Sequence, residues 1–253
     1  MQMIRVNNLV KKYGNLTALD GISFEITQGE ICGYIGTNGA GKSTTVKILT
    51  GEIDYESGDV FINNIDVRKS AVEVKKITGY VPETANLFNA LTVSEYFDFI
   101  CTVRKISDRI KDKRVNYFAG LFDFKEIINE SIGVLSKGNK QKVLITSALL
   151  HNPEIILLDE PLNGLDANSI LTFQDIISEL AKRGKIIFYC SHLLDIIEKI
   201  SEKIIIIEKG KILMDKKTED LKKTSDYSGL ENLFRNLKDN SETKKFRYED
   251  IFD

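Results

Sequence analysis

Residues 31–44 read ICGYIGTNGAGKST, and this stretch decides the fold. Its start, Ile31–Ile35, is an apolar run typical of a buried strand, and residues 42–50 follow with the apolar spacing of a helix. Between them lies the pattern Gly, four residues, Gly-Lys-Ser/Thr. Its glycines let backbone N–H groups point at phosphate oxygens, and the positive end of the following helix faces the same charge.

The stretch therefore predicts a phosphate-binding loop between a strand and a helix. Lys42 would bridge the β- and γ-phosphates of a nucleotide, and the Ser43 hydroxyl would ligate Mg²⁺. The loop residues expected to bind the nucleotide are Gly36, Thr37, Asn38, Gly39, Ala40, Gly41, Lys42, Ser43 and Thr44.

The rest of the chain supplies the elements of an α/β fold. Short apolar runs at 154–158, 185–190 and 203–207 have the pattern of strands covered on both faces, which predicts a central, mainly parallel sheet. Alternating apolar and polar residues over 4–13 and 22–26 predict an antiparallel β subdomain. Crossover helices are expected over residues 42–50, 138–151 and 167–181.

Residues 84–134 differ from their surroundings because they carry helix-spaced apolar and aromatic positions and no strand pattern. They predict an inserted all-helical subdomain, whose first helix begins with a capping box of Thr92 and Glu95. We expect one catalytic domain over residues 1–215. The charged extension 216–253 is expected to form a peripheral helix around residues 230–237 and a mobile tail.

Composition narrows the class of partner. The chain has 253 residues, 35 basic and 37 acidic side chains and a net charge of −2, so no overall charge favours nucleic acid, and we expect no such partner. The three cysteines lie far apart in apolar stretches, as in a reducing compartment. Uncharged stretches reach only 11 residues, too few for a membrane-spanning helix, and no secretory signal is visible. We expect a cytoplasmic protein.

Two adjacent carboxylates follow the predicted strand at 154–158. Asp159 would hold Mg²⁺ and Glu160 would act as general base toward water, because the carboxyl edge of a parallel sheet is where ligands bind. A solvated Asp-Glu turn is the alternative. His192 follows the next strand and is placed to meet a γ-phosphate, whereas His151 is interpreted as a cationic cap at a helix end.

With these motifs in order, residues 3–215 resemble an ATP-binding-cassette (ABC) ATPase, the nucleotide-binding subunit of an ABC transporter, with a P-loop NTPase core. Residues 36–44 match the Walker A loop and 155–160 match Walker B with its catalytic glutamate. Residues 135–141, LSKGNKQ, resemble the signature, and Asn163–Asp166 resembles the D-loop. The resemblance makes His192 the switch histidine and Tyr13 the aromatic that stacks on adenine.

In this family two subunits pack head to tail, and each ATP lies between the Walker A loop of one and the signature of the other. The resemblance therefore implies that the signature residues contact ATP bound by the opposite subunit. From the residues alone, Ser136 and Gly138 are either an anion site or a simple helix cap. The signature residues are Ser136, Lys137, Gly138 and Asn139, and the D-loop acid is Asp166.

Two departures from the family pattern are visible. Glu83 stands where glutamine is usual; its carboxylate can still bind metal, although it cannot donate a hydrogen bond. Lys137 and Asn139 replace the usual glycine and glutamine of the signature. Similar variants occur in exporter-type cassettes with separate membrane subunits, which favours export by analogy.

The resemblance implies an ATPase that binds ATP with Mg²⁺, pairs with a second ABC ATPase subunit, identical or different, and drives an integral membrane permease from the cytoplasmic face as a peripheral protein. The alternatives are a soluble cassette that remodels a cytoplasmic complex and a P-loop kinase. Phe88, Leu91 and Phe99 would either form a groove for a short helix of the permease or pack inside the helical insertion.

Overall fold

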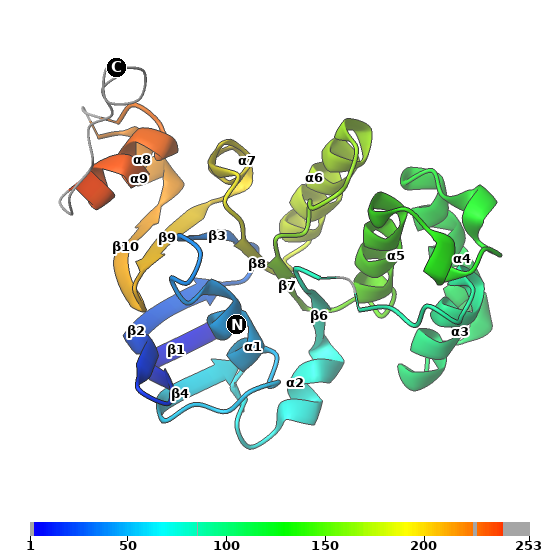
Figure 1. Ribbon diagram of the computed structural model, residues 1–253, viewed down its shortest axis with the longest axis horizontal. Coiled ribbons are helices and arrows are strands. Elements are labelled where there is room, and N and C mark those ends of the chain that lie inside the picture. The colour runs from blue at the N-terminus through cyan, green and yellow to red at the C-terminus, as the bar shows by residue number, and fades with distance from the viewer. Residues whose placement is uncertain (1–2, 85, 225–226, 240–253) are drawn as a thin grey trace, which may run out of the picture.

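A computed structural model describes residues 3–84, 86–224 and 227–239. Figure 1 shows three parts arranged side by side: an antiparallel sheet with β1, β2 and β4, a central sheet that contains β3, β7 and β8, and a group of helices formed by α3, α4 and α5. The central sheet links the other two parts. The fold is the mixed α/β arrangement expected from the sequence.

The central sheet has six strands in the order β10-β9-β3-β8-β7-β6, parallel except for β10, which pairs antiparallel with β9. All five residues of each of the strands β3, β7 and β8 are buried, because both faces of the central sheet are covered. The strands are β3 (Ile31–Ile35), β6 (Thr78–Val81), β7 (Ile155–Asp159), β8 (Ile186–Cys190), β9 (Lys203–Glu208) and β10 (Lys211–Lys217).

The antiparallel sheet has the strand order β2-β1-β4-β5. Its inward residues alternate along β1, where Ile4 and Val6 are fully buried and pair with Ile26 and Phe24 of β2. These side chains share one core with α1 and with one face of the central sheet. The strands are β1 (Met3–Tyr13), β2 (Leu16–Thr27), β4 (Ser57–Ile62) and β5 (Ile65–Asp66).

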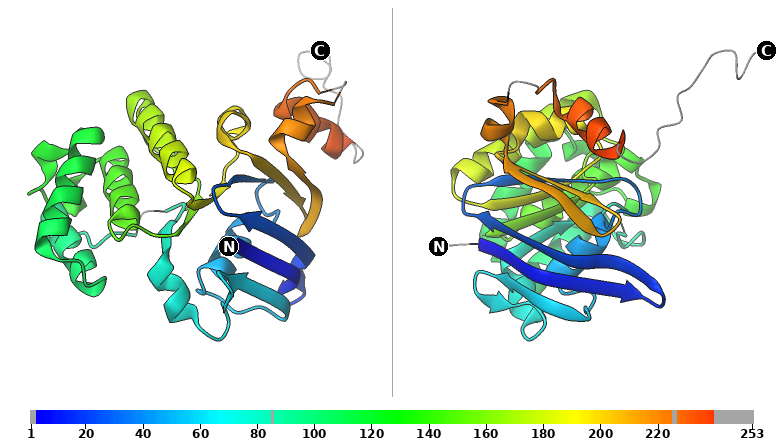
Figure 2. Two further views of the ribbon diagram at one scale, coloured as in Figure 1. Left: turned by 180° about the vertical axis from the view of Figure 1, so that it is seen from behind. Right: turned by 90° about the vertical axis from the view of Figure 1, so that its left-hand side faces the viewer.

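Residues 86–134 contain α3, α4 and two short 3₁₀ turns, and in Figure 2 they lie at the end of the molecule away from the antiparallel sheet. Thr92 and Glu95 form the expected capping box, because the Thr92 hydroxyl accepts the Glu95 N–H and the Glu95 carboxylate accepts the Thr92 N–H. The helices of the chain are α1 (Lys42–Leu49), α2 (Ala71–Ile77), α3 (Val93–Val103), α4 (Asp108–Leu121), α5 (Lys137–Leu149), α6 (Ala167–Lys182), α7 (Leu194–Ile200), α8 (Thr218–Lys222) and α9 (Leu230–Asp239), with 3₁₀ turns at Lys125–Ile127 and Ile132–Val134.

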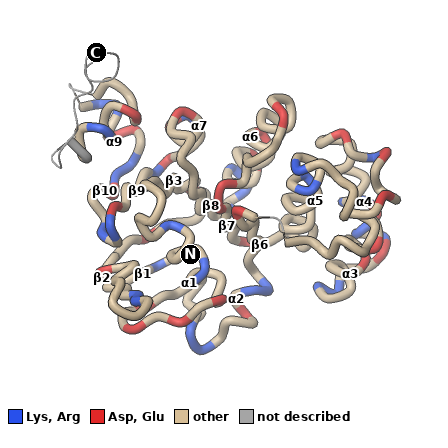
Figure 3. The backbone as a smooth tube through the Cα atoms, in the orientation of Figure 1, with Lys and Arg blue, Asp and Glu red and all other residues tan. Residues whose placement is uncertain are grey.

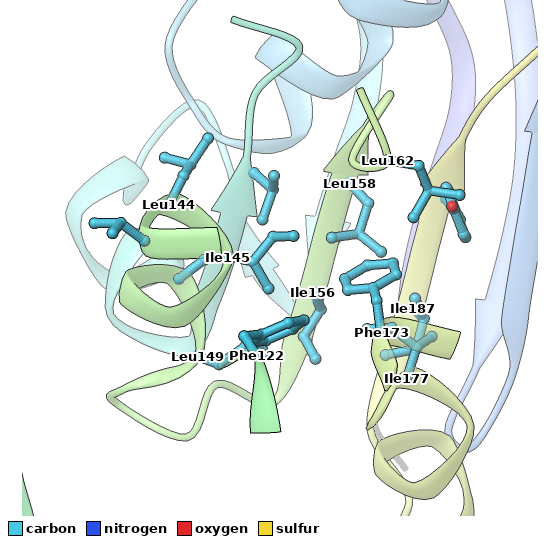
Figure 4. Close-up of a cluster of buried hydrophobic side chains, with 14 of the residues drawn as sticks. Phe122, Leu144, Ile145, Leu149, Ile156, Leu158, Leu162, Phe173, Ile177 and Ile187 are labelled. Atoms are coloured by element: carbon cyan, nitrogen blue, oxygen red, sulfur yellow. The ribbon is translucent and has the colours of Figure 1, made fainter. Parts of the chain in front are cut away.

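A second core joins the helices to the other face of the central sheet. Figure 4 shows apolar side chains of α5 and α6 packed around β7, where Ile156 and Leu158 are buried. This packing fixes the position of α5, and with it that of Ser136 at the start of α5, relative to the end of β7. The labelled side chains are Phe122, Leu144, Ile145, Leu149, Ile156, Leu158, Leu162, Phe173, Ile177 and Ile187.

The C-terminal extension begins inside a strand, because β10 continues through the expected boundary at residue 215. The expected peripheral helix is α9, whereas the expected mobile tail, residues 240–253, lies outside the described residues. Basic and acidic residues are spread together over most elements (Figure 3). In the part of the chain described here, every helix is too short or too polar to span a lipid bilayer.

Candidate active site

The loop after β3 needs glycine for two different reasons. Gly39 and Gly41 have φ angles of 80° and 113°, which side chains disfavour. Gly36 leaves no room for a side chain, because a Cβ there would lie 2.5 Å from the carbonyl oxygen of Ile207. The loop therefore turns tightly against β9 before α1 begins.

Lys42 is held over this loop. It is only 7 % exposed, and its Nζ donates hydrogen bonds to the carbonyl oxygens of Gly36 at 2.7 Å and Thr37 at 3.3 Å. The ammonium group and the N-terminus of α1 thus place positive charge on one spot, which suits a phosphate.

A cavity of about 500 Å³ opens beside the loop. Tyr13 lies on its wall, and Leu16, Thr17, Ala18 and Lys209 also line it. The structure thus brings most of the predicted nucleotide residues together around one space. The predicted residues that line it are Tyr13, Thr37, Asn38, Gly39, Gly41, Lys42, Ser43, Thr44, Glu83, Asp159 and Glu160.

An adjoining cavity of about 530 Å³ contains the remaining predicted residues of this edge. Gly36 and His192 line it, and it shares Thr37, Asn38, Glu83 and Glu160 with the first cavity. Ala40 lines neither cavity, because its side chain is buried in the core beneath the loop.

Asp159 ends β7 and is 2 % exposed. Burial raises the pKa of its carboxyl group. A hydrogen bond from Ser43 opposes this rise, whereas the negative charges of Glu83 and Glu160 add to it. Its Oδ1 is buried and accepts no hydrogen bond among the described residues. A buried carboxylate oxygen in this state is suited to bind a cation.

Glu160 occupies a strained position at the start of the turn after β7. Its φ angle is 47°, and its N–H donates to the carbonyl oxygen of Cys190 at 3.0 Å. Its Oε2 lies 2.9 Å from Nδ1 of His192 and accepts a hydrogen bond from the Ser191 hydroxyl at 3.2 Å. Because a carboxylate only accepts, Nδ1 of His192 carries a proton in this contact.

The signature residues lie elsewhere. Ser136 caps α5, with its hydroxyl accepting the Asn139 N–H at 3.2 Å, and it is exposed. Gly138 packs closely on the turn at residues 161–164, which follows β7. A Cβ on Gly138 would lie 2.6 Å from the Gly164 carbonyl oxygen, and Lys137 also lies against Gly164. Among the described residues that line the two cavities beside the phosphate loop, none belongs to 136–139.

Asp166 caps α6, accepting the Ser169 N–H at 2.9 Å and its hydroxyl at 2.6 Å. These bonds, together with an ion pair to Lys142 at 3.1 Å, hold the pKa of Asp166 well below its usual range. Asp166 therefore links α6 to α5 and does not line either cavity.

Sequence reasoning missed several residues that shape this site. Gln141 of α5 is buried and donates from Nε2 to the Pro161 carbonyl oxygen at 2.8 Å, which ties α5 to the turn that carries Glu160. Ser191 could have been found from its place beside His192. Phe234, which lines the cavity with His192, comes from the C-terminal extension, and no local pattern indicated it.

The interpretation of His151 as a cationic helix cap is wrong. Its Nε2 lies 2.9 Å from the Thr78 carbonyl oxygen in β6. Burial lowers the pKa of His151 to about 4, so the ring is neutral at pH 7.

The sequence profile of the ABC transporter family matches residues 19–163, which span the phosphate loop, the signature and the Asp159–Glu160 pair. The chain belongs to the ABC transporter family. It is 37 % identical over 218 residues to MJ1023, an uncharacterized ABC transporter ATP-binding protein of Methanocaldococcus jannaschii, covering 86 % of this chain and 79 % of that one. It is 34 % identical over 222 residues to the bacitracin transport ATP-binding protein BcrA of Bacillus licheniformis, covering 87 % and 72 %.

Solved cassettes share the fold. The structure of an ATP-binding subunit of an ABC transporter superposes with a TM-score of 0.88 at 26 % identity, covering 93 % of this chain and 99 % of that one. The cassette MJ0796, solved as a dimer in a post-hydrolysis state with ADP and Pi, gives a TM-score of 0.78 at 25 % identity, covering 85 % and 98 %. The chain is thus an ATP-binding subunit of the ABC type with the ATPase fold.

Proposed function

We propose that this ABC ATPase hydrolyses MgATP in sites shared between two subunits, and that closing and reopening of the dimer drives export through a separate permease. The proposal rests on the observation that the sequence motifs lie in two separate places on the chain. The phosphate loop, Asp159, Glu160 and His192 share one edge of the sheet, whereas Ser136 and Gly138 lie outside both cavities there. A second subunit that presents its signature would complete the site.

Within one chain the roles follow from position. Lys42 and the loop amides bind the phosphates, and Glu160 accepts a proton from the attacking water. His192, held beside Glu160, orients toward the γ-phosphate through its other ring nitrogen. Tyr13 lies at the far wall of the cavity, where a base can stack on its ring.

Three side chains near the end of β7 also fit Mg²⁺. Ser43, Asp159 and Glu83 offer hydroxyl and carboxylate oxygens, the ligands that this ion prefers, and Asp159 Oδ1 is buried without a hydrogen bond among the described residues. When bound with ATP, the ion neutralises charge on the phosphate oxygens. Glu83 would serve as a ligand here in place of the usual glutamine.

The partner proposal rests on an exposed aromatic pair. Phe88 and Phe99 are 56 % and 45 % exposed, and their rings meet edge to face at 5.4 Å. Leu91, grouped with them in the sequence, is half-buried and packs against the core. We assign this aromatic pair as the surface that binds a short helix of a permease. Such binding would place the subunit at the cytoplasmic face of the membrane. The name of one relative, the bacitracin transport ATP-binding protein BcrA, supports a function in transport.

The test is affinity capture of the tagged Glu160→Gln protein from native membranes in mild detergent with MgATP, followed by mass spectrometry. We expect a stoichiometric polypeptide with several membrane-spanning helices, which Phe88→Glu in the same background fails to recover while it still binds ATP. Recovery from the soluble fraction only, with cytoplasmic partners, would contradict the transport function.

A further inference from the structure

The C-terminal helix α9 packs against α7, the helix that begins two residues after His192 (Figures 1 and 2). At the start of α9, the Leu230 N–H donates to Oε2 of Glu198 at 2.8 Å, and the Leu230 side chain is fully buried. One turn later Phe234 lines the same cavity as Leu194.

The same cavity brings α9 to the catalytic residues. Its walls include the phosphate-loop residues 36–38, Glu160 and His192 together with Phe234. Among the described residues of the extension, Phe234 is thus the one that lines the cavity with Glu160 and His192.

The half-buried side chains of Leu194, Ile196 and Ile200 pack α7 against the core. The helix has seven residues, of which only Ile197 is buried. Ile197 packs on β3 at Gly33, where a Cβ would lie 2.3 Å from the Ile197 side chain. Further support comes from α9, which contacts α7: its Leu230 N–H binds Glu198, and its Phe234 lines the same cavity as Leu194. The apolar residues of the extension that join the core are Tyr227, Leu230, Leu233, Phe234 and Leu237.

Glu198 is the centre of this contact. It accepts the first N–H of α9, a place where a carboxylate is favoured by the helix dipole. Burial, together with the neighbouring Glu198 carboxylate, raises the pKa of Tyr227, so the tyrosine hydroxyl stays protonated beside the acid. The chain enters α9 through Gly229, whose φ angle is 106°.

We infer that α9 is a brace for the switch histidine: Phe234 and Leu230 hold α7 against β3 and thereby keep the His192 ring beside Glu160. Phe234 is a positioning residue that acts through His192. The inference rests on the proposed role of His192 in hydrolysis.

The test measures ATP turnover and ATP affinity for Phe234→Ala in the full chain. We expect kcat to fall roughly tenfold, the scale of a small misplacement of a catalytic group, while the Kd for ATP is unchanged. Phe234→Leu restores most of the rate because it keeps the apolar contact. Asn236→Ala, on the exposed side of α9, is the matched control and leaves the rate unaltered.

The same substitution in a His192→Ala background separates positioning from a general loss of structure. If Phe234 acts through His192, Phe234→Ala causes no further loss there. An equal loss in both backgrounds, or a faster rate for Phe234→Ala, as a blocking helix would give, overturns the brace and leaves the proposed function standing. An unchanged rate for His192→Ala alone refutes the role of His192, and the brace with it.

A second readout does not depend on activity. The chain has two histidines, so its Hε1 ring protons give two NMR signals, one for each histidine. Phe234→Ala should shift or broaden the His192 signal and leave that of His151 in place. Identical His192 signals in the variant and the parent would contradict the brace.

Discussion

The two halves of the ATP site in this chain differ in how they are held. At the sheet edge, Lys42, Asp159 and Glu160 are less than one-tenth exposed. Lys42 donates hydrogen bonds to its own loop, whereas Asp159 and Glu160 interact with side chains of other segments. At the start of α5, Ser136 and Lys137 are exposed. Buried charges persist where counter-charges and hydrogen bonds balance them, whereas an exposed helix start is available to another molecule. The difference fits the proposal that the sheet edge binds ATP within one chain and that the start of α5 completes the site of a second subunit.

The largest effect is expected at the sheet edge. Glu160→Gln removes the proton acceptor and keeps the size of the side chain, so ATP turnover should fall roughly 10²- to 10⁴-fold, the range of a general base. ATP binding is retained, and a dimer accumulates in size-exclusion chromatography with MgATP. An unchanged hydrolysis rate would refute the assignment of Glu160.

A substitution at the exposed start of α5 should reduce turnover without changing the affinity for ATP. Ser136→Arg places a bulky cation at the start of α5, and turnover should drop on the order of 10²-fold because the dimer cannot close on the γ-phosphate. Titration with a fluorescent ATP analogue should give the parental Kd, since Ser136 lines neither cavity. A weakened Kd in the isolated chain would show that Ser136 serves its own site.

His151 lies two residues past the end of α5 and is partly buried, so its protonation should make the stability of the fold depend on pH. Since the folded state lowers the pKa of His151 to about 4, the unfolded chain binds more protons between pH 6.5 and 4. The contribution of His151 to stability is therefore constant above about pH 6.5 and decreases as pH falls through this window, by up to roughly 3 kcal/mol. Urea unfolding of His151→Gln should lack this decrease, whereas His192→Gln should keep it. Equal pH profiles for His151→Gln and the parent would contradict a buried, neutral ring.

The smallest effect on turnover is expected at the ion pair between Lys142 of α5 and Asp166, which connects the two halves of the proposed site. Lys142→Met removes the ion pair with Asp166 and retains the apolar packing of a mostly buried side chain, so the free energy of unfolding should fall by about 1 kcal/mol. Turnover should fall a few-fold, because α5 and the Glu160 turn are less firmly connected. Lys140→Met, whose Nζ contacts the Gly133 carbonyl oxygen, is the control. A rate loss without any loss of stability would point to direct contact of Lys142 with ATP.

The sequence predicts those parts of the site that depend on local chemistry. The phosphate loop, the capping box at Thr92 and the Asp159–Glu160 pair are readable because a few adjacent residues determine each. The contacts of Gln141 with Pro161, of Gly138 with Gly164 and of Phe234 with the catalytic cavity join segments 20 or more residues apart, and only folding brings them together. The neutral state of His151 is not predictable for the same reason, since burial against segments distant in the sequence, including β6 with Thr78, lowers its pKa.

The most direct test of the central claim is the ATPase activity per chain of the purified protein over a 100-fold range of concentration, with molecular mass measured in parallel. A site shared by two subunits predicts that activity per chain rises with concentration as dimers form, and that Ser136→Arg abolishes the rise. Constant activity per chain from a monomer, insensitive to Ser136→Arg, would show that one chain hydrolyses ATP alone.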